Sequence, residues 1–125
     1  MPPRRRSRGR TARLGELLAT VWLRLKGDRI VERNWRCKLG ELDVVCRRGD
    51  VLAFVEVRTR RGRSAGTPEA SVDTRKQEQV ARVARAYLAR RRVDAERMRF
   101  DVVAVGGGWP PIRHLAGAFI ARDPG

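Results

Sequence analysis

The sequence lacks the features that mark several large classes of protein. Its two cysteines, Cys37 and Cys46, have a spacing that fits neither a zinc-binding motif nor a redox-active CxxC motif. We expect two buried or half-buried free thiols, which suits a reducing cytoplasm. No apolar run approaches the length of a transmembrane helix, and the basic N-terminus lacks the apolar segment of a secretory signal. A cytoplasmic protein with no membrane partner is therefore expected.

Two further absences narrow the range of functions. Aromatic residues make up only 6% of the chain, whereas RNA-binding modules that stack bases usually need exposed aromatic side chains. The glycine-containing loop between Arg60 and Gly66 lacks the Gly-Lys-Ser/Thr ending of a phosphate-binding loop, so nucleotide hydrolysis is not expected. A role as a basic assembly factor for RNA-rich particles is the weakest of the functions considered.

Basic residues are the most abundant feature that the chain does have. The 125 residues carry 26 arginines and three lysines against 14 acidic residues, which gives a net charge of +15 and a pI of about 11.7. Base composition of the genome can explain the preference for arginine over lysine, but it does not explain the total charge. A charge of this size attracts polyanions, and nucleic acid is the commonest polyanion in a cell.

The length suits one domain with one hydrophobic core. Residues 1–12 read as a disordered basic arm and residues 13–122 as a folded α/β domain. The first helix is expected over residues 11–26, with Thr11 as N-cap and Gly27 as terminator. Apolar residues at helical spacing predict the face of this helix that is buried. They are Leu14, Leu17, Leu18, Val21, Trp22 and Leu25.

The middle of the chain predicts a β-hairpin. A short strand over residues 29–33 precedes strands over residues 40–46 and 51–58, with turn residues between the last two. The third strand is apolar almost to its end, which indicates a central strand covered on both faces.

The remaining elements complete a mixed α/β order. Thr67, Pro68 and Glu69 resemble an N-cap, a first helical residue and an acidic first turn, and a helix should continue to about Arg91, with a break near Asp73. A strand over residues 100–105 and an edge strand over residues 112–115 follow. The order αβββαβ, with a further β, predicts a mixed β-sheet flanked by helices. His114 is expected at the surface or at a strand edge.

Acidic residues at the ends of the hairpin strands are the candidate chemical site. Glu56 and Arg58 share one face of a strand because they are two residues apart. If Gly49 and Asp50 form a two-residue loop, Asp43 lies opposite Glu56, and Glu41 lies opposite Arg58. A three-residue loop without a bulge would instead place the two pairs on different faces.

Two carboxylates that lie opposite each other suit a divalent cation. Mg²⁺ or Mn²⁺ bound by Asp43 and Glu56 could orient and activate a water molecule for attack on a phosphodiester, with a nearby cation stabilising the developing charge. The alternative interpretation of the same residues is a structural ion pair between Glu56 and Arg58 at the end of a strand.

Five segments, taken together, resemble one known family. They are GELLA at residues 15–19, RNWRC at residues 33–37, GELDVVCRRGDVLAFVEVRTR at residues 40–60, ASVDTRKQ at residues 70–77 and RFDVVAV at residues 99–105. In this order and spacing they are similar to the YraN-type family of small bacterial proteins. That family belongs to the PD-(D/E)xK superfamily, so the resemblance implies a restriction-endonuclease-like core.

The resemblance also implies roles for individual residues. Asp43 matches the metal-binding aspartate, and Glu56 matches the acidic residue of the ExK element. Arg58 stands where the superfamily usually has lysine, and a guanidinium is a poor general base because its pKa exceeds about 12. Glu16 matches a helix-one glutamate of such sites, although helical periodicity alone places it toward solvent. Lys76 extends the inward stripe of the second helix and could supply the cation that Arg58 replaces; a solvent-directed lysine is the alternative.

The sequence therefore predicts a Mg²⁺- or Mn²⁺-dependent endonuclease that acts on DNA, including branched or repair intermediates. Arg60, Arg61, Arg63 and Arg75 are the candidate contacts to the nucleic-acid backbone. A non-catalytic nucleic-acid-binding protein that retains the nuclease fold is the second hypothesis, and Arg58 favours it. Small nucleases of this kind often act as dimers, so a homodimer is one expectation.

Overall fold

The computed structural model describes residues 9–60, 72–93 and 97–119. The chain forms two helices and five strands in the order expected from the sequence, including the final edge strand. The elements are α1 (Arg10–Leu25), β1 (Arg29–Cys37), β2 (Gly40–Arg48), β3 (Val51–Arg60), α2 (Thr74–Arg91), β4 (Arg97–Gly106) and β5 (Ile112–Phe119). Residues 10–12, assigned above to the basic arm, are the first residues of α1.

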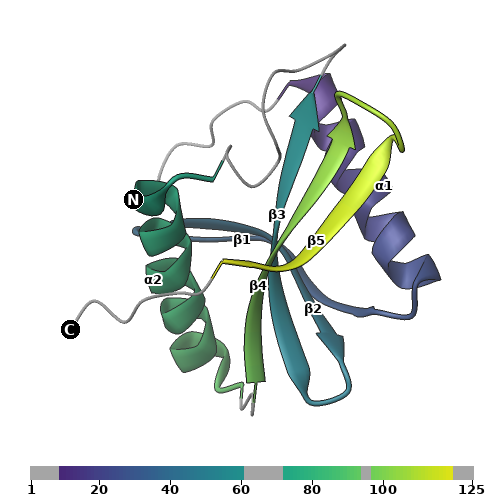
Figure 1. Cartoon of the computed structure of the whole chain (residues 1–125). Coiled ribbons are helices and arrows are strands. Elements are labelled where there is room, and N and C mark those ends of the chain that lie inside the picture. Colours follow the sequence, from purple (N-terminus) through teal and green to yellow (C-terminus); the bar gives the residue numbers. More distant parts are fainter. Residues whose placement is uncertain (1–8, 61–71, 94–96, 120–125) are drawn as a thin grey trace.

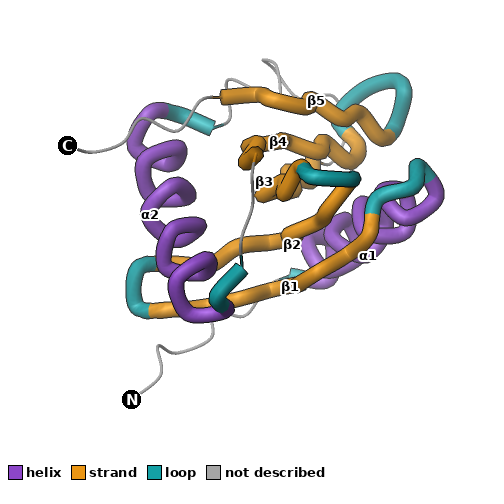
Figure 2. The backbone as a smooth tube through the Cα atoms, turned by 90° about the horizontal axis from the view of Figure 1, so that it is seen from below, coloured by secondary structure: helices purple, strands orange, loops and turns teal. Residues whose placement is uncertain are grey.

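All five strands form one mixed sheet with the spatial order β1-β2-β3-β4-β5. Neighbouring strands are antiparallel except β3 and β4, which are parallel and are connected across the sheet by α2. The two helices lie on opposite sides of the twisted sheet (Figures 1 and 2). β3 is central and buried on both faces, as its continuous apolar sequence predicts.

The β2–β3 hairpin has the predicted two-residue loop at Gly49 and Asp50. Gly49 has a φ of +60°, which glycine adopts without the steric cost that a side chain would bring. Arg48 is paired with Val51, and the same register continues along the hairpin as far as Val44 and Val55. The register predicted from the sequence is therefore confirmed up to the residues that precede the candidate site.

A hydrophobic core fills each face of the sheet. The core on the α2 side contains Phe54, Tyr87 and Phe100, and the smaller core on the α1 side contains Leu23, Val55 and Val103. Because successive side chains of a strand point to opposite faces, the apolar run in β3 supplies both cores.

The break expected near Asp73 is present at the start of the second helix. Residues 72 and 73 are not helical, and α2 starts at Thr74 with the Asp73 carboxylate accepting a hydrogen bond from the Lys76 backbone N–H at 2.9 Å. Asp73 is therefore the N-cap of α2. The N-cap expected at Thr67 lies outside the described residues. The apolar residues at helical spacing in α2 pack against the sheet. Val80, Val83, Ala84 and Tyr87 are buried, and Leu88 is partly buried.

The orientation of α1 differs from the one that its apolar stripe predicts. Small and polar residues face the sheet, whereas most of the predicted stripe is exposed. The buried residues of the helix are Gly15, Glu16, Ala19, Thr20 and Leu23. The exposed members of the stripe are Leu14, Leu17, Leu18, Val21 and Leu25. The physical reason is a close approach of α1 to β3, which the larger leucine side chains would prevent.

Gly15 makes this close approach sterically feasible. A Cβ atom at residue 15 would lie 2.0 Å from Thr59 Oγ1, so only glycine fits where α1 crosses the end of β3.

Neither described helix is both long and apolar enough to cross a bilayer.

Candidate functional site

Glu56 is the most deeply buried charged residue of the candidate site. It lies in the middle of the central strand β3, which continues to Arg60 and so extends beyond the end expected from the sequence, and only 4% of its surface is exposed. Removing a carboxylate from water is costly unless it is paired, hydrogen-bonded or bound to a metal. The burial of Glu56 therefore requires compensating positive charge close to its carboxylate.

Two cationic side chains supply that charge from different elements. Lys76 Nζ, in the first turn of α2, lies 3.8 Å from Glu56 Oε2, and Arg58 Nη2, two residues further along β3, lies 4.0 Å from the same oxygen. Both distances are longer than a direct hydrogen bond. Glu56, Arg58 and Lys76 therefore lie close together, with Lys76 directed toward the sheet, and their roles in a site stay predictions.

Asp43 is held beside the same part of β3. Its Oδ2 accepts a hydrogen bond from the backbone N–H of Val57 at 2.9 Å. Regular pairing of β2 with β3 runs from the hairpin turn to Val44 and Val55 and stops there. The Asp43 side chain bonds to β3 just beyond this last pair. Because the Val57 nitrogen belongs to the peptide bond that follows Glu56, this hydrogen bond fixes the Asp43 carboxylate next to that peptide.

Glu41, which was expected opposite Arg58, pairs on its other side. It lies in register with Arg36 of β1, and Arg36 Nε is 3.0 Å from Glu41 Oε2.

The Nε atom of Arg58 is buried and has no hydrogen-bond partner among the described residues. A buried guanidinium donor of this kind is suited to an anionic acceptor.

Glu16 is buried, so the exposure inferred from helical periodicity is wrong. Only 8% of its surface is exposed, and it lies on the side of α1 that packs against the sheet. The rotation of α1 that buries Gly15 against Thr59 also turns Glu16 inward. The placement of Glu16 within the fold agrees with the resemblance, whereas its role stays a prediction.

The carboxylates of Asp43 and Glu56 offer oxygen atoms of the kind that Mg²⁺ prefers, and their use as metal ligands stays a prediction. The described residues contain no group of three or more histidine, cysteine, aspartate and glutamate side chains arranged to hold a metal ion. Such a group is typical of zinc sites, whereas Mg²⁺ is commonly held by one or two carboxylates together with water and substrate phosphate oxygens. The hard oxygen atoms of Asp43 and Glu56, beside cations that can approach a phosphate, meet the second description.

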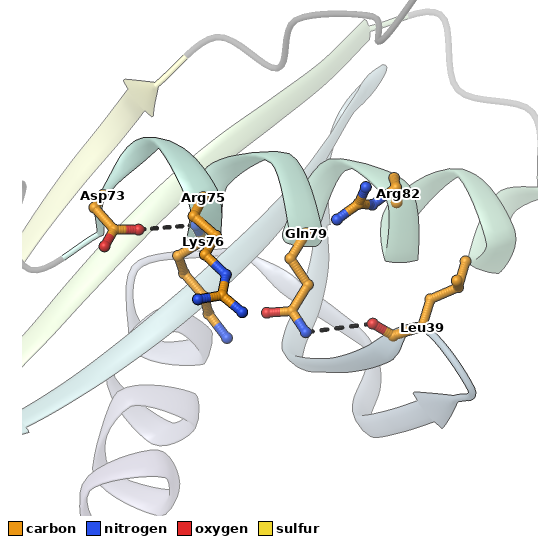
Figure 3. Close-up of a pocket in the computed structure, with 6 residues that line it drawn as sticks. All are labelled: Leu39, Asp73, Arg75, Lys76, Gln79 and Arg82. Carbon is orange, nitrogen blue, oxygen red and sulfur yellow. Dashed lines mark hydrogen bonds between the residues drawn. The ribbon is translucent and has the colours of Figure 1, made fainter.

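The arginines expected to contact nucleic acid have different surroundings. Arg60 is exposed at the end of β3, and Arg61 and Arg63 lie outside the described residues. Arg75 is exposed in the first turn of α2 and lines a pocket of about 410 Å³ that also includes Lys76 (Figure 3). Sequence reasoning missed two further polar residues of this pocket, Gln79 and Arg82, because the pocket forms only where α2 meets the β1–β2 turn.

A second buried carboxylate lies in β4, outside the candidate site. Asp101 is fully buried and accepts hydrogen bonds from Arg99 at 2.8 and 2.9 Å, from His114 Nε2 at 2.8 Å and from the Gly117 N–H at 2.9 Å. Burial by itself would raise the pKa of Asp101, but the hydrogen bonds from His114, Arg99 and Gly117 lower it below its usual value. Asp101 therefore links β4 to the edge strand β5.

His114 connects this network to α1. Lys26 Nζ lies 2.9 Å from His114 Nδ1, and an ammonium group can only donate, so Nε2 carries the proton donated to Asp101. The His114 side chain is 6% exposed, which corrects the expectation of a surface position, although its strand is at the sheet edge as expected.

The two cysteines are free and buried, in agreement with the sequence. Burial raises the pKa of the Cys46 thiol to about 12, and the nearby carboxylates of Asp28 and Asp101 act in the same direction. A thiol with this pKa stays protonated near neutral pH, so Cys46 is a packing residue and has little nucleophilic character.

Comparison with known proteins gives one consistent result. A family model described as Uncharacterised protein family UPF0102 matches residues 15–105, which include Glu16, Asp43, Glu56, Arg58 and Lys76. Among the relatives is a UPF0102 protein of Syntrophotalea carbinolica, which is 48% identical over 109 residues, covering 86% of this chain and 89% of the relative.

Further relatives come from other bacterial sources. A UPF0102 protein of Moorella thermoacetica is 46% identical over 99 residues, covering 79% of this chain and 82% of its own. One of Nocardia farcinica is 45% identical over 108 residues, covering 84% of this chain and 85% of its own. The chain therefore belongs to the UPF0102 family, which is the YraN-type family that its motifs resemble.

Proposed function

We propose that this protein is a metal-dependent nuclease that hydrolyses phosphodiester bonds of DNA, including branched or repair intermediates. The observation that carries the proposal is the buried carboxylate of Glu56, next to the peptide that Asp43 binds and within 4.0 Å of Lys76 and Arg58. Two acids and two cations around the place where β2 and β3 stop pairing suit a phosphodiester, which needs a metal-binding group and compensation of its negative charge. The net charge of +15 supports attraction of a polyanionic substrate.

Each residue of the site has a distinct part in the proposal. Asp43 and Glu56 would hold Mg²⁺ or Mn²⁺, which when bound polarises the phosphate and lowers the pKa of a water molecule. A guanidinium is a poor general base, so the contribution of Arg58 would be charge stabilisation of the phosphate rather than proton abstraction. Lys76 reaches Glu56 from α2 and can contribute a second positive charge at the same place.

Cleavage assays test the proposal with variants in which one carboxylate is replaced by the matching amide. Plasmid, single-stranded and branched DNA are incubated with Mg²⁺ or Mn²⁺, with an EDTA control, for the wild type, Asp43→Asn, Glu56→Gln and Asp50→Asn. Asp50 lies in the turn of the same hairpin and is exposed, so its substitution removes the same charge outside the site. We expect cutting by the wild type and Asp50→Asn, with a loss of at least about 100-fold in the two site variants. Folded wild-type protein that cuts none of these substrates with either metal contradicts the proposal.

A non-catalytic nucleic-acid-binding protein is the second candidate. Arg58 favours it, because arginine stands where the superfamily usually has lysine, and because Arg58 and Lys76 both pair with Glu56 and can neutralise it without a metal. In that case Asp43→Asn leaves DNA affinity unchanged or increases it, since the substitution removes a charge that repels phosphate. Weaker DNA binding by Asp43→Asn, measured by fluorescence anisotropy in EDTA, argues against this candidate.

A further inference from the structure

The pocket beside the N-terminus of α2 is built from two elements that are distant in sequence. Its volume is about 410 Å³, within the range of about 300–1,000 Å³ that is usual for ligand pockets. Gln79 Nε2 donates a hydrogen bond to the Leu39 backbone oxygen at 3.3 Å, which ties the helix to the β1–β2 turn (Figure 3). Its lining residues are Leu39, Asp73, Arg75, Lys76, Gln79 and Arg82.

Gly40 contributes to the close contact between turn and helix. Its φ is +145°, and a Cβ atom at this position would come within 3.0 Å of Gln79 Nε2. The pocket wall is therefore formed by a specific backbone conformation in the turn as well as by side chains of α2.

Positive charge in the pocket exceeds the charge that the pocket itself can neutralise. Arg75, Lys76 and Arg82 provide three cations, and Asp73 is the only acid among the described residues that line the pocket. One oxygen of the Asp73 carboxylate already accepts the Lys76 backbone N–H as the helix N-cap. Within the part of the chain that the structure describes, neither Arg75 nor Arg82 forms an ion pair.

Two of these cations lie at the positive end of the helix, where the Asp73 carboxylate is the acid at the N-cap. The N-terminal end of a helix carries a partial positive charge, and acidic residues are the ones that stabilise a first turn. The first turn of α2 contains no acid and instead contains Arg75 and Lys76. A bound anion would be attracted by both side chains, by Arg82 about two turns further along, and by the helix dipole.

Lys76 connects the pocket to the candidate cleavage site. The residue lines the pocket and also reaches Glu56 Oε2 at 3.8 Å. We infer that the pocket is a binding subsite for a phosphate of the nucleic-acid strand that flanks the scissile phosphate, held by Arg75 and Arg82 with Gln79 as an additional donor. The location of this phosphate relative to the cut rests on the proposed nuclease function, whereas the binding of a backbone phosphate in the pocket does not.

The salt dependence of DNA binding tests the subsite. The probe is a fluorescent single-stranded oligonucleotide without terminal phosphates, so only backbone phosphates are available, and anisotropy is measured in EDTA from 50 to 200 mM NaCl. The pocket variant Arg75→Gln/Arg82→Gln is compared with Arg24→Gln/Arg33→Gln, which removes the same charge from exposed positions on α1 and β1. Each phosphate contact to a single strand contributes about 0.7 to the slope of log K against log salt concentration.

The expected result is a slope that is smaller in magnitude by about 0.7 for the pocket variant, which loses one phosphate contact, and unchanged for the control variant. Equal slopes for the two variants, each with the thermal unfolding midpoint of the wild type, overturn the subsite. Cleavage of DNA by the wild type together with equal slopes leaves the nuclease function standing without the subsite. A smaller slope in the pocket variant without cleavage by the wild type leaves the subsite standing without the nuclease function.

Discussion

Gly15 determines how closely α1 approaches the strand that carries the candidate site. A Cβ atom at residue 15 would lie 2.0 Å from Thr59 Oγ1 and 3.1 Å from the other Thr59 side-chain atoms. Thr59 follows Arg58 directly in β3, so the helix rests on the strand beside the site. Glycine normally destabilises a helix interior by about 1 kcal/mol relative to alanine, which makes steric fit the physical reason for its presence here.

We predict that Gly15→Ala destabilises the protein even though alanine is the better helix former. The contact with Thr59 forces α1 away from β3, and this cost should exceed the propensity gain of about 1 kcal/mol. Thr59→Ala removes Oγ1 and Cγ2, so the double variant should recover part of the loss. Urea unfolding of the four proteins gives a coupling energy, expected between about 0.5 and 3 kcal/mol. Additive effects of the two substitutions would show that the contact does not set the helix position.

Asp101 is the residue whose ionisation the fold stabilises most visibly. Its pKa lies below the usual value because hydrogen bonds from His114, Arg99 and Gly117 outweigh burial. An acid with a lowered folded-state pKa stabilises the protein above its unfolded pKa of about 3.9, and this contribution is lost as pH falls toward the folded pKa.

We predict that the stability difference between wild type and Asp101→Asn is largest near pH 6 and decreases below about pH 4. The amide cannot reproduce the charged contacts to Arg99, but protonation of Asp101 in the wild type removes the same advantage. Denaturant unfolding of both proteins at pH 6 and pH 3 measures the difference, and the net positive charge that acid adds is common to both. A difference that is independent of pH would contradict the contribution assigned to the ionised carboxylate.

The orientation of α1 is the largest discrepancy between sequence and structure at the scale of an element. The leucine stripe satisfies the helical template, but five of its members are 42–81% exposed, whereas Ala19, Thr20 and Leu23 are buried. Periodicity counts apolar residues and contains no information on how near the helix lies to its partner. A helix that packs closely on a sheet buries small residues. The sequence pattern marks Gly15 only as part of the GELLA motif and does not indicate its contact with β3.

We predict that Leu23→Ala is far more destabilising than Leu17→Ala. Leu23 is fully buried between α1 and the sheet, whereas Leu17 is 48% exposed. Truncation of a buried leucine typically costs about 2–5 kcal/mol, and surface substitutions usually change stability by less than about 0.5 kcal/mol. Thermal or urea unfolding of the two variants measures this difference. Equal losses, or a larger loss for Leu17→Ala, would show that the apolar stripe faces the sheet.

Other properties of the elements were predictable because they depend on local chemistry. The two-residue turn at Gly49 and Asp50 fixes the hairpin register, and the apolar run of β3 marks a central strand. The end of β2–β3 pairing after Val44 and Val55 was not predictable, because it depends on the Asp43 side chain replacing a strand partner. The break before α2 was predictable near Asp73, whose side chain forms the N-cap.

The residues of the candidate site also divide into those whose positions local sequence patterns predict and those whose positions they do not. Strand periodicity placed Glu56 and Arg58 on one face, and helical spacing pointed Lys76 inward; both placements agree with the contacts to Glu56. The inward position of Glu16 followed only from family resemblance. Arg82 and Gln79 gave no signal, because their pocket depends on the contact between α2 and a turn about 40 residues earlier in the chain.

At the scale of the whole molecule, an acidic site lies within a strongly basic protein. The net charge of +15 attracts nucleic acid over the whole surface, but the carboxylates of Asp43 and Glu56 repel a phosphate at the site itself. Lys76 and Arg58 offset part of this repulsion. A divalent cation bound between the acids and the phosphate would remove the rest, which makes metal binding the central requirement of the proposed function.

Calorimetric titration with Mn²⁺ in the absence of DNA tests this requirement most directly, with Mn²⁺ standing in for Mg²⁺. We predict one binding site in the wild type and in Asp50→Asn, and at least a tenfold weaker affinity in both Asp43→Asn and Glu56→Gln. Folded wild-type protein that binds no Mn²⁺ at millimolar concentrations, or site variants that bind it as tightly as the wild type, would contradict a metal site formed by these two carboxylates.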